Sequence, residues 1–253
     1  MGDRPFARPP RVLVPELAAR RGSSEEILLR KEEREHVRSR RLRDGTKVVV
    51  LDGKGLRARG KLTRSGTAVA HLSFEESSSS SFLLSPLPGE PGNRVTVLLA
   101  CAEPARVEWA IEKGTECGAA GFVLLDAGRS QRSHVAALSK RIPRLIRIAE
   151  EAVKQCDRTI VPFVEGPKRT EEFLRGLRGE TLLVADPMGV SSASFAPGAG
   201  RDFAVAIGPE GGFTEDEKRL FRDDGAMPVS LGPRILRLET AVVVALARLV
   251  DPA

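Results

Sequence analysis

The amino-acid sequence predicts an α/β domain with a mainly parallel sheet, preceded by a smaller unit of short β-strands. In the C-terminal part, apolar β-branched runs alternate with segments of helical length, which is typical of parallel strands joined by helices. In the N-terminal part, short strand-like runs are separated by glycine turns, which favours a small β-barrel. A stretch rich in serine, proline and glycine lies between the two parts and indicates a domain boundary.

The N-terminal part, residues 1–74, is expected to contain short strands and one helix. One strand ends at the turn signal Asp52-Gly53, and the next alternates apolar and basic residues, as a half-exposed strand does. Glu32–Arg43 has the composition of a helix and is rich in arginine. The expected strands are Arg11–Val14, Glu25–Arg30, Thr46–Leu51, Leu56–Leu62 and Thr67–Phe74.

The segment 75–92 is expected to be a linker or a long surface loop. Five consecutive serines, Ser77–Ser81, are followed by prolines and glycines up to Gly92, a composition that does not build a packed core. The chain is therefore predicted to consist of a barrel domain (1–74), a linker (75–92) and an α/β domain (93–253).

The α/β domain is expected to alternate strands and helices along its whole length. Thr214 and Glu217 stand at the spacing of a capping box at the start of one helix. The expected strands are Arg94–Ala100, Phe122–Leu125, Ile160–Val164, Thr181–Ala185, Phe203–Ile207 and Val229–Leu231. The expected helices are Ala105–Cys117, Val135–Gln155, Thr170–Leu177, Thr214–Asp224 and Glu239–Val250.

Positive charge is concentrated in the N-terminal third of the chain. The formal net charge of the whole chain is +6, but residues 1–73 carry 18 Arg and Lys against 9 Asp and Glu. The remaining residues therefore carry a small negative excess. This asymmetry favours a module that binds a polyanion, joined to a nearly neutral body; a solvated basic face without a partner is the alternative.

Several classes of protein are disfavoured by composition. The three cysteines and three histidines are scattered and form no zinc-binding spacing, so neither a metal site nor a disulfide is expected. No apolar run is long enough to span a membrane, and no signal segment is recognisable, so we expect a cytoplasmic protein. Aromatic residues are too few for an extended base-stacking platform.

Two glycine-rich blocks carry the chemistry. The first, Ala206–Glu217, runs from a buried strand through Gly208, Gly211 and Gly212 into a capped helix. Glycine lets the backbone approach a ligand closely, and a helix N-terminus offers free N–H groups. A tight strand-to-helix turn without a ligand is the alternative. The patterns of P-loop and dinucleotide-binding proteins are absent, which disfavours a nucleotide-binding α/β enzyme.

The second block, Ser230–Ala241, also leads from a short strand through a glycine into a helix. It carries Arg234, Arg237 and Glu239, which as an isolated motif would be an ordinary connection with a surface ion pair. Two such turns after strands of one sheet would both lie at the carboxyl ends of the strands, where open α/β sheets bind ligands.

The two blocks resemble the signature pair of a known family. The sequences I-G-P-E-G-G-F-T-E-x-E and L-G-x-R-I-L-R-x-E-T-A, with their spacing, are similar to those of the RsmE family of ribosomal RNA small subunit uridine-N3 methyltransferases, which belongs to the SPOUT superfamily. Glu112–Gly118, Glu151–Arg158 and His36–Arg43 resemble further segments of that family. The resemblance thus extends over nearly the whole chain.

The resemblance implies a SPOUT-type sheet with a C-terminal trefoil knot, a PUA-like RNA-binding barrel and a homodimer. It also implies S-adenosylmethionine as cofactor and ribosomal RNA or the small ribosomal subunit as partner. Backbone of the two blocks, and of the segment after Thr181–Ala185, would hold the cofactor. The implied cofactor-binding residues are Ala185, Asp186, Pro187, Gly208, Pro209, Glu210, Gly211, Leu231, Gly232, Arg234, Ile235 and Leu236.

The acceptor chemistry suggests which side chains act. Uridine N3 is a poor nucleophile until its proton leaves, so a base or a cation near the carbonyl oxygens should help. Glu210 and Glu239 are candidate bases, and Arg237, with Arg234, is a candidate to stabilise negative charge. Basic residues would hold RNA phosphates. The candidate RNA-binding residues are Arg38, Arg40, Arg41, Arg43, Arg57, Arg59, Arg129, Arg132 and Arg158.

The chain departs from the family pattern at two places. Leu238 stands where the family usually has threonine, and the loop Cys101–Arg106 lacks the usual lysine. The departures support one alternative, a catalytically inactive RNA-binding or ribosome assembly factor of the same fold. A second alternative, which the SPOUT superfamily implies, is an enzyme that methylates a ribose 2′-hydroxyl.

Overall fold

The computed structural model describes residues 9–17, 27–65, 69–74, 89–175, 179–195 and 201–251. The chain divides into two compact units, Met1–Gly89 with Val153–Ile160, and Glu90–Ala152 with Val161–Ala253. Most of the expected linker, 75–88, lies outside the described residues. The predicted domain boundaries therefore stay a prediction.

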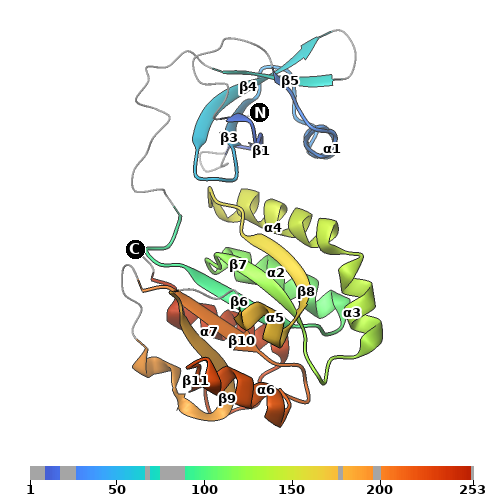
Figure 1. Ribbon diagram of the computed structural model, residues 1–253. Coiled ribbons are helices and arrows are strands. Elements are labelled where there is room, and N and C mark those ends of the chain that lie inside the picture. Colours follow the sequence, from blue (N-terminus) through green and yellow to red (C-terminus); the bar gives the residue numbers. More distant parts are fainter. Residues whose placement is uncertain are drawn as a thin grey trace. The chain divides into compact units, whose positions relative to one another are not determined.

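The first unit contains one five-stranded sheet in the order β1-β3-β4-β5-β2 (Figure 1). Its strands β1 and β3 pair in parallel, and the other pairs are antiparallel. Val12, Val37 and Val50 belong to its apolar core. The elements are β1 (Arg11–Leu13), β2 (Ile27–Leu28), α1 (Lys31–Ser39), β3 (Lys47–Leu51), β4 (Arg57–Ser65) and β5 (Val69–Phe74).

Polar contacts attach Val153–Ile160 to the first unit. The Nζ of Lys154 donates a hydrogen bond to Oε1 of Glu33 at 2.9 Å, and both side chains are buried. Arg11 donates to the carboxylate of Asp157 at 3.0 Å. A buried pair of this kind constrains the local arrangement because either charge alone would be costly to bury.

The second unit is built on a six-stranded sheet in the order β11-β9-β10-β6-β7-β8. All of its strand pairs are parallel. The prediction of an α/β fold with a mainly parallel sheet is therefore confirmed. The strands are β6 (Val95–Ala100), β7 (Gly121–Asp126), β8 (Phe163–Arg169), β9 (Thr181–Ser191), β10 (Phe203–Ile207) and β11 (Met227–Ser230).

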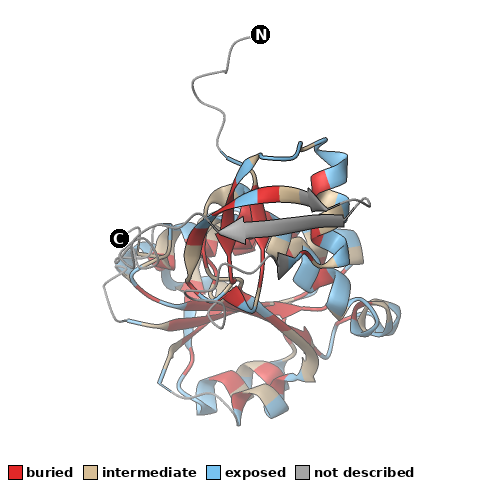
Figure 2. Ribbon diagram, turned by 90° about the horizontal axis from the view of Figure 1, so that it is seen from above, coloured by how far each residue is buried: buried red, intermediate tan, exposed pale blue. Residues whose placement is uncertain are grey.

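Helices cover both faces of this sheet, because successive strand residues point to opposite sides. Val97 and Leu99 of β6 belong to one apolar core, with residues of α2, α3, α4 and α7. Leu98 belongs to the other core, with residues of α5 and α6. Buried residues accordingly line the strands (Figure 2). The helices are α2 (Pro104–Glu116), α3 (Arg132–Ser139), α4 (Ile142–Cys156), α5 (Thr170–Leu174), α6 (Glu215–Asp223) and α7 (Leu238–Leu249).

Three predicted elements of the second unit were wrong in detail. The strand expected at Thr181–Ala185 is β9, which continues to Ser191. The single helix expected at Val135–Gln155 is two helices, because Pro143 has no N–H to donate to the carbonyl of residue 139. The strand expected at Ile160–Val164 is instead β8, which begins at Phe163 and contains Gly166-Pro167. The edge position of β8 tolerates this proline, since an edge strand need not donate along both sides.

Asn93 joins the start of the second unit to its end. Its Nδ2 donates to the carbonyl of Leu249 at 2.8 Å and to that of Arg201 at 3.1 Å. Its Oδ1 accepts from the backbone N–H of Asp251 at 2.9 Å. The side chain is buried and uses three of its hydrogen bonds, so it fixes the end of α7 beside β6.

Candidate active site

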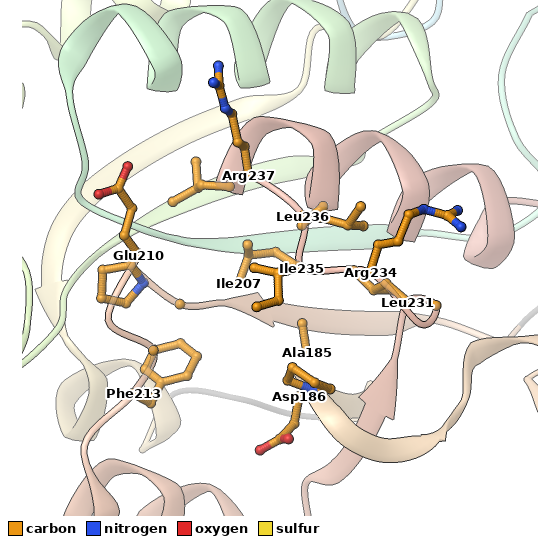
Figure 3. Close-up of a pocket in the computed structure, with 17 residues that line it drawn as sticks. Ala185, Asp186, Ile207, Glu210, Phe213, Leu231, Arg234, Ile235, Leu236 and Arg237 are labelled. Carbon is orange, nitrogen blue, oxygen red and sulfur yellow. The ribbon is translucent and has the colours of Figure 1, made fainter.

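A cavity of about 340 Å³ lies where β9, β10 and the β11–α7 connection come together (Figure 3). Because β9, β10 and β11 are parallel neighbours, both glycine-rich blocks lie at the same edge of the sheet. The cavity is lined by Ala185, Asp186, Pro187, Ile207, Gly208, Pro209, Glu210, Gly212, Phe213, Leu231, Gly232, Arg234, Ile235, Leu236, Arg237, Leu238 and Ala241.

Two glycines are required by the shape of this cavity. Gly232 has φ +133°, a backbone conformation that other residues rarely adopt. A Cβ on Gly208 would lie 3.2 Å from the ring of Phe213, which is tighter than ordinary contact. Backbone therefore forms part of the cavity wall at both positions.

A hydrogen-bonded cluster around Glu217 holds the first block in place. The expected capping box is present, because Thr214 Oγ1 accepts from the N–H of Glu217 at 3.2 Å and the Glu217 carboxylate accepts from the N–H of Thr214 at 2.9 Å. Glu217 also accepts from the N–H of Gly128 at 2.9 Å and from the hydroxyl of Thr170 at 3.1 Å. The turn that carries Glu210 is thus anchored at its C-terminal end to the loop after β7 and to the first residue of α5.

A second, more polar cavity of about 470 Å³ adjoins the first. The two cavities share Pro209 and Glu210 as wall residues. A guanidinium N–H of Arg106 donates to the carboxylate of Glu210, and Arg129 donates to the carbonyl of Gly211. The second cavity is lined by Cys101, Ala102, Glu103, Arg106, Arg129, Ser130, Gln131, His134, Pro209, Glu210 and Gly211.

Two titratable groups of the second cavity, Arg106 and Cys101, have raised pKa values. The hydrogen bond to Glu210 raises the pKa of Arg106, and the charges of Glu210, Glu239 and Glu103 raise it further. Burial raises the pKa of the Cys101 thiol to about 12, with a smaller contribution from the charge of Asp126. The cavity therefore presents a fixed cation at Arg106 and a neutral thiol at Cys101.

The expected cofactor residues gather around the first cavity. All of them line it except Gly211, which lines the second cavity. Of the expected catalytic residues, Glu210 lines both cavities and Arg237 lines the first. Their side chains extend to the same side, whereas that of Arg234 extends elsewhere (Figure 3). Glu239 lines neither cavity; its Oε2 is buried and has no hydrogen-bond partner among the described residues.

The expected RNA-binding arginines differ in exposure. Arg57 is partly buried, with an Nη 4.0 Å from Asp157 Oδ1. Arg158 is only 4% exposed, so the expectation that it contacts RNA at the surface does not fit the structure. The matching sequence segment could not reveal this burial. The exposed arginines of the set are Arg38, Arg40, Arg41, Arg43, Arg59, Arg129 and Arg132.

Both departures from the family pattern lie at the cavities. Leu238 is 4% exposed, belongs to the apolar core and lines the first cavity. The segment Cys101–Arg106, which runs from the end of β6 into the first turn of α2, borders the second cavity and supplies one of its cations through Arg106. Sequence reasoning missed Arg106 because its partner, Glu210, is 104 residues away; an arginine in a loop where a lysine is expected was the available signal.

Among the residues that the structure describes, no helix is both long enough and apolar enough to cross a membrane. Within the same residues, no cluster of three or more His, Cys, Asp or Glu could hold a metal ion.

Comparison with known proteins identifies the family. The family model for the RNA methyltransferase domain matches residues 89–250. Ribosomal RNA small subunit methyltransferase E of Mycobacterium bovis is 30% identical over 214 residues, which cover 82% of this chain and 79% of that protein. The protein of the same name from Synechocystis is 33% identical over 215 residues, covering 83% of this chain and 67% of that protein. The chain belongs to the ribosomal RNA small subunit methyltransferase E family.

Solved structures agree with this membership. A Legionella pneumophila protein, described as a methyltransferase in complex with the cofactor SAM, is 26% identical with a TM-score of 0.80, and the match covers 95% of this chain and 96% of that one. Ribosomal RNA small subunit methyltransferase E of Neisseria gonorrhoeae shares the fold at 23% identity with a TM-score of 0.79, again covering 95% and 96%. The resemblance inferred from the two glycine-rich blocks is confirmed, and with it the expectation that the chain is a methyltransferase.

Proposed function

We propose that this chain transfers the methyl group of S-adenosylmethionine to N3 of a uridine in small-subunit ribosomal RNA. The observation that carries the proposal is the cavity of about 340 Å³ formed by both family blocks at one edge of the parallel sheet. The Mycobacterium bovis and Synechocystis relatives carry the name of the rRNA small subunit enzyme, and the Legionella pneumophila relative was solved with SAM.

The walls of the first cavity suit a sulfonium cofactor. Ile207, Leu231 and Leu236 supply apolar surface that excludes water, and Gly208 and Gly232 let backbone groups approach. The volume lies within the usual range for cofactor sites, ~300–1,000 Å³. When bound, S-adenosylmethionine supplies an electrophilic methyl group, so the protein needs no metal and acts through positioning and charge. The remaining residues proposed to bind it are Ala185, Asp186, Pro187, Pro209, Glu210, Gly211, Arg234 and Ile235.

Glu210, Arg237 and Glu239 are the proposed catalytic residues. Glu210 borders both cavities, so the uracil ring of a target nucleotide in the second cavity could lose its N3 proton to this carboxylate. Arg237 would stabilise negative charge on the uracil ring or hold an RNA phosphate. Glu239, with its unpaired oxygen, supports the charge of Arg106. Unchanged turnover in both Glu239→Gln and Arg237→Ala would remove these two residues from the mechanism.

The finer features of the fold are part of the same proposal. The chain leaves β11 at the edge of the sheet, and α7 then packs against β10 and β6 near its middle, which supports a trefoil knot in the C-terminal third. The five-stranded sheet of the first unit supports a PUA-like barrel. The homodimer rests on the family resemblance, and analytical ultracentrifugation of the full chain would test it. The cytoplasmic location stays a prediction.

The exposed arginines are proposed to hold RNA phosphates. Arg38, Arg40, Arg41 and Arg43 lie on α1 or directly after it, and Arg59 lies on β4. Arg129 and Arg132 are exposed in the second unit, where Arg129 borders the second cavity. Contacts with phosphates orient RNA without reading its sequence.

The decisive experiment is methyl transfer from labelled S-adenosylmethionine to small ribosomal subunits from a strain that lacks this gene, followed by nucleoside analysis. We expect 3-methyluridine. A 2′-O-methylated nucleoside would instead identify a ribose methyltransferase. Binding of the donor without transfer of label would identify an inactive RNA-binding or assembly factor.

A further inference from the structure

The second cavity has the properties of a site for a polar ligand. It borders the proposed donor cavity through Glu210 and Pro209, so a ligand there would lie next to a bound donor. Ser130, 8% exposed, lines it, and its hydroxyl oxygen is buried without a hydrogen-bond partner among the described residues. Buried hydroxyls are nearly always hydrogen-bonded, so an orphan at a cavity wall indicates a missing partner.

The Arg106–Glu210 pair presents a donor beside an acceptor at the boundary of the two cavities. Its partners come from α2 and from the turn after β10, so the fold itself brings them together. A guanidinium has five N–H donors and a carboxylate about four acceptor sites, so the pair can stay bonded and still bind a further group. The complementary ligand has an acceptor next to an N–H donor.

We propose that the Arg106–Glu210 pair recognises the N3–H and adjacent carbonyl edge of the target uracil and prepares it for methylation. This inference rests on the proposed function and assigns its acceptor site. Arg106 donates to the carbonyl oxygen, while Glu210 accepts the hydrogen bond from N3–H. Cytosine has no hydrogen on N3, so its N3 lone pair would face the carboxylate and be repelled.

The same pair balances the reaction. Glu210 takes the N3 proton, and the negative charge that remains on the ring and its carbonyl oxygens is stabilised by Arg106. The N3 electron pair forms a bond to the methyl carbon as the carbon–sulfur bond breaks, and the electrons of that bond pass to sulfur. The positive charge of the sulfonium and the negative charge of the deprotonated uracil are neutralised in the same step. Glu210 then returns its proton to solvent.

The charged groups around Arg106 favour this role. Glu103, in the turn before α2, lies 3.5 Å from Arg106 Nε, and Glu239 on α7 adds a further negative charge. Glu103 helps to orient the guanidinium, and the charges of both carboxylates favour its protonated form. Arg129 and His134 line the same cavity. Cys101 also lines it and is neutral, so no thiolate opposes the formation of the anionic base.

The test uses full-length protein and small subunits that lack the modification. Arg106→Gln should lower kcat on the order of 100-fold, as loss of one donor to a developing anion does, with binding of S-adenosylhomocysteine within about twofold of wild type. The difference in kcat between Arg106→Gln and wild type should become about tenfold smaller between about pH 7 and about pH 9. At the higher pH, hydroxide removes the N3 proton of the uracil without help from the protein. Arg106→Lys should recover part of the rate.

Arg144→Gln is the matched control, because Arg144 also pairs with a glutamate, Glu108, but lines neither cavity. It should turn over as wild type does. Turnover of Arg106→Gln within about threefold of wild type would overturn the inference. A loss of kcat that is the same at every pH would also overturn it. So would an equal loss of kcat in Arg106→Gln and Arg106→Lys when both variants have the melting temperature of wild type. Absence of 3-methyluridine with the wild-type protein would instead overturn the proposed function itself.

Discussion

The Glu217 carboxylate accepts from the backbone N–H of Thr214, and the Thr214 hydroxyl accepts from the backbone N–H of Glu217, across the first turn of α6. The same carboxylate also accepts from Gly128 and Thr170. Glu217 is 8% exposed. This residue does more than cap a helix, because it also fixes the loop after β7 and the start of α5 beside the turn that carries Glu210.

Glu217→Ala should therefore lower the free energy of unfolding by about 3 kcal/mol, since it leaves one buried donor, the Thr170 hydroxyl, and several partly buried donors without an acceptor. Urea denaturation of the full chain measures this change. Glu215→Ala, an exposed neighbour paired with Lys218, should leave the urea midpoint unchanged. Equal effects of the two substitutions would contradict the role assigned to Glu217.

Leu238 should be required for stability as well as for the shape of the donor cavity. Leu238→Ala should cost about 2–5 kcal/mol of unfolding free energy, and Leu238→Thr about 2 kcal/mol, because both remove buried apolar volume. Both should weaken binding of S-adenosylhomocysteine, which isothermal titration calorimetry would measure.

Ile235 provides the comparison, because it lines the same cavity but is 95% exposed. Ile235→Ala should change the free energy of unfolding by less than about 0.5 kcal/mol. If Leu238→Ala were equally mild, the leucine at this position would be a passive substitute for threonine.

The Cys101 thiol should stay protonated and unreactive in the native protein. Its pKa of about 12 exceeds the ordinary value of 9.0, so above about pH 9 the unfolded chain loses this proton before the native chain does. The native state then binds more protons, and stability should fall as pH rises from about 9 to about 12, by up to about 1.4 kcal/mol per unit.

Iodoacetamide labelling at about pH 8, read by peptide mass spectrometry, checks this prediction. Cys117 and Cys156, which are partly exposed, should react before Cys101, and all three should react in urea. In Cys101→Ala the alkaline decline in stability should be shallower. Rapid labelling of Cys101 in the folded protein would disprove the assignment.

The arginines at the end of α1 should contribute to the salt dependence of RNA binding. The slope of log affinity against log salt concentration is negative, and each phosphate contact adds about 0.7–0.9 to its magnitude. Replacing Arg40 and Arg43 by Gln should reduce that magnitude by about 1.5, as filter binding to small-subunit RNA over a salt series would show. Arg219→Gln on α6 should leave the slope unchanged; an equal reduction there would point to general electrostatics.

Local sequence signals predicted most of the second unit. The bounds of β10 and the capping box of Thr214 and Glu217 were correct because both depend on residues close in sequence. The break between α3 and α4 was missed because the apolar period continues across it, although Pro143 marks it. The start of β8 was misjudged because the apolar residues 160–164 precede a strand whose Gly166-Pro167 is tolerated only at a sheet edge.

The candidate site was predicted as far as its backbone goes. Glycines after consecutive parallel strands must share one edge of the sheet, so the first cavity followed from topology. The second cavity did not, because Arg106 on α2, Arg129 after β7 and Glu210 after β10 are far apart in sequence and no local pattern relates them. Likewise, the burial of Arg158 depends on tertiary packing that a sequence match does not encode.

The position of β6 between β7 and β10 has a consequence for biosynthesis. One edge of β6 finds its partner soon after it emerges from the ribosome, but the other must wait for Phe203–Ile207, about 100 residues later. At ~5–20 residues per second this edge stays unpaired for about 5–20 s. Nascent chains should depend on chaperones during that interval, and products truncated before Phe203 should aggregate through the open strand. An enzyme of ribosome maturation thus completes its own core only near the end of its translation.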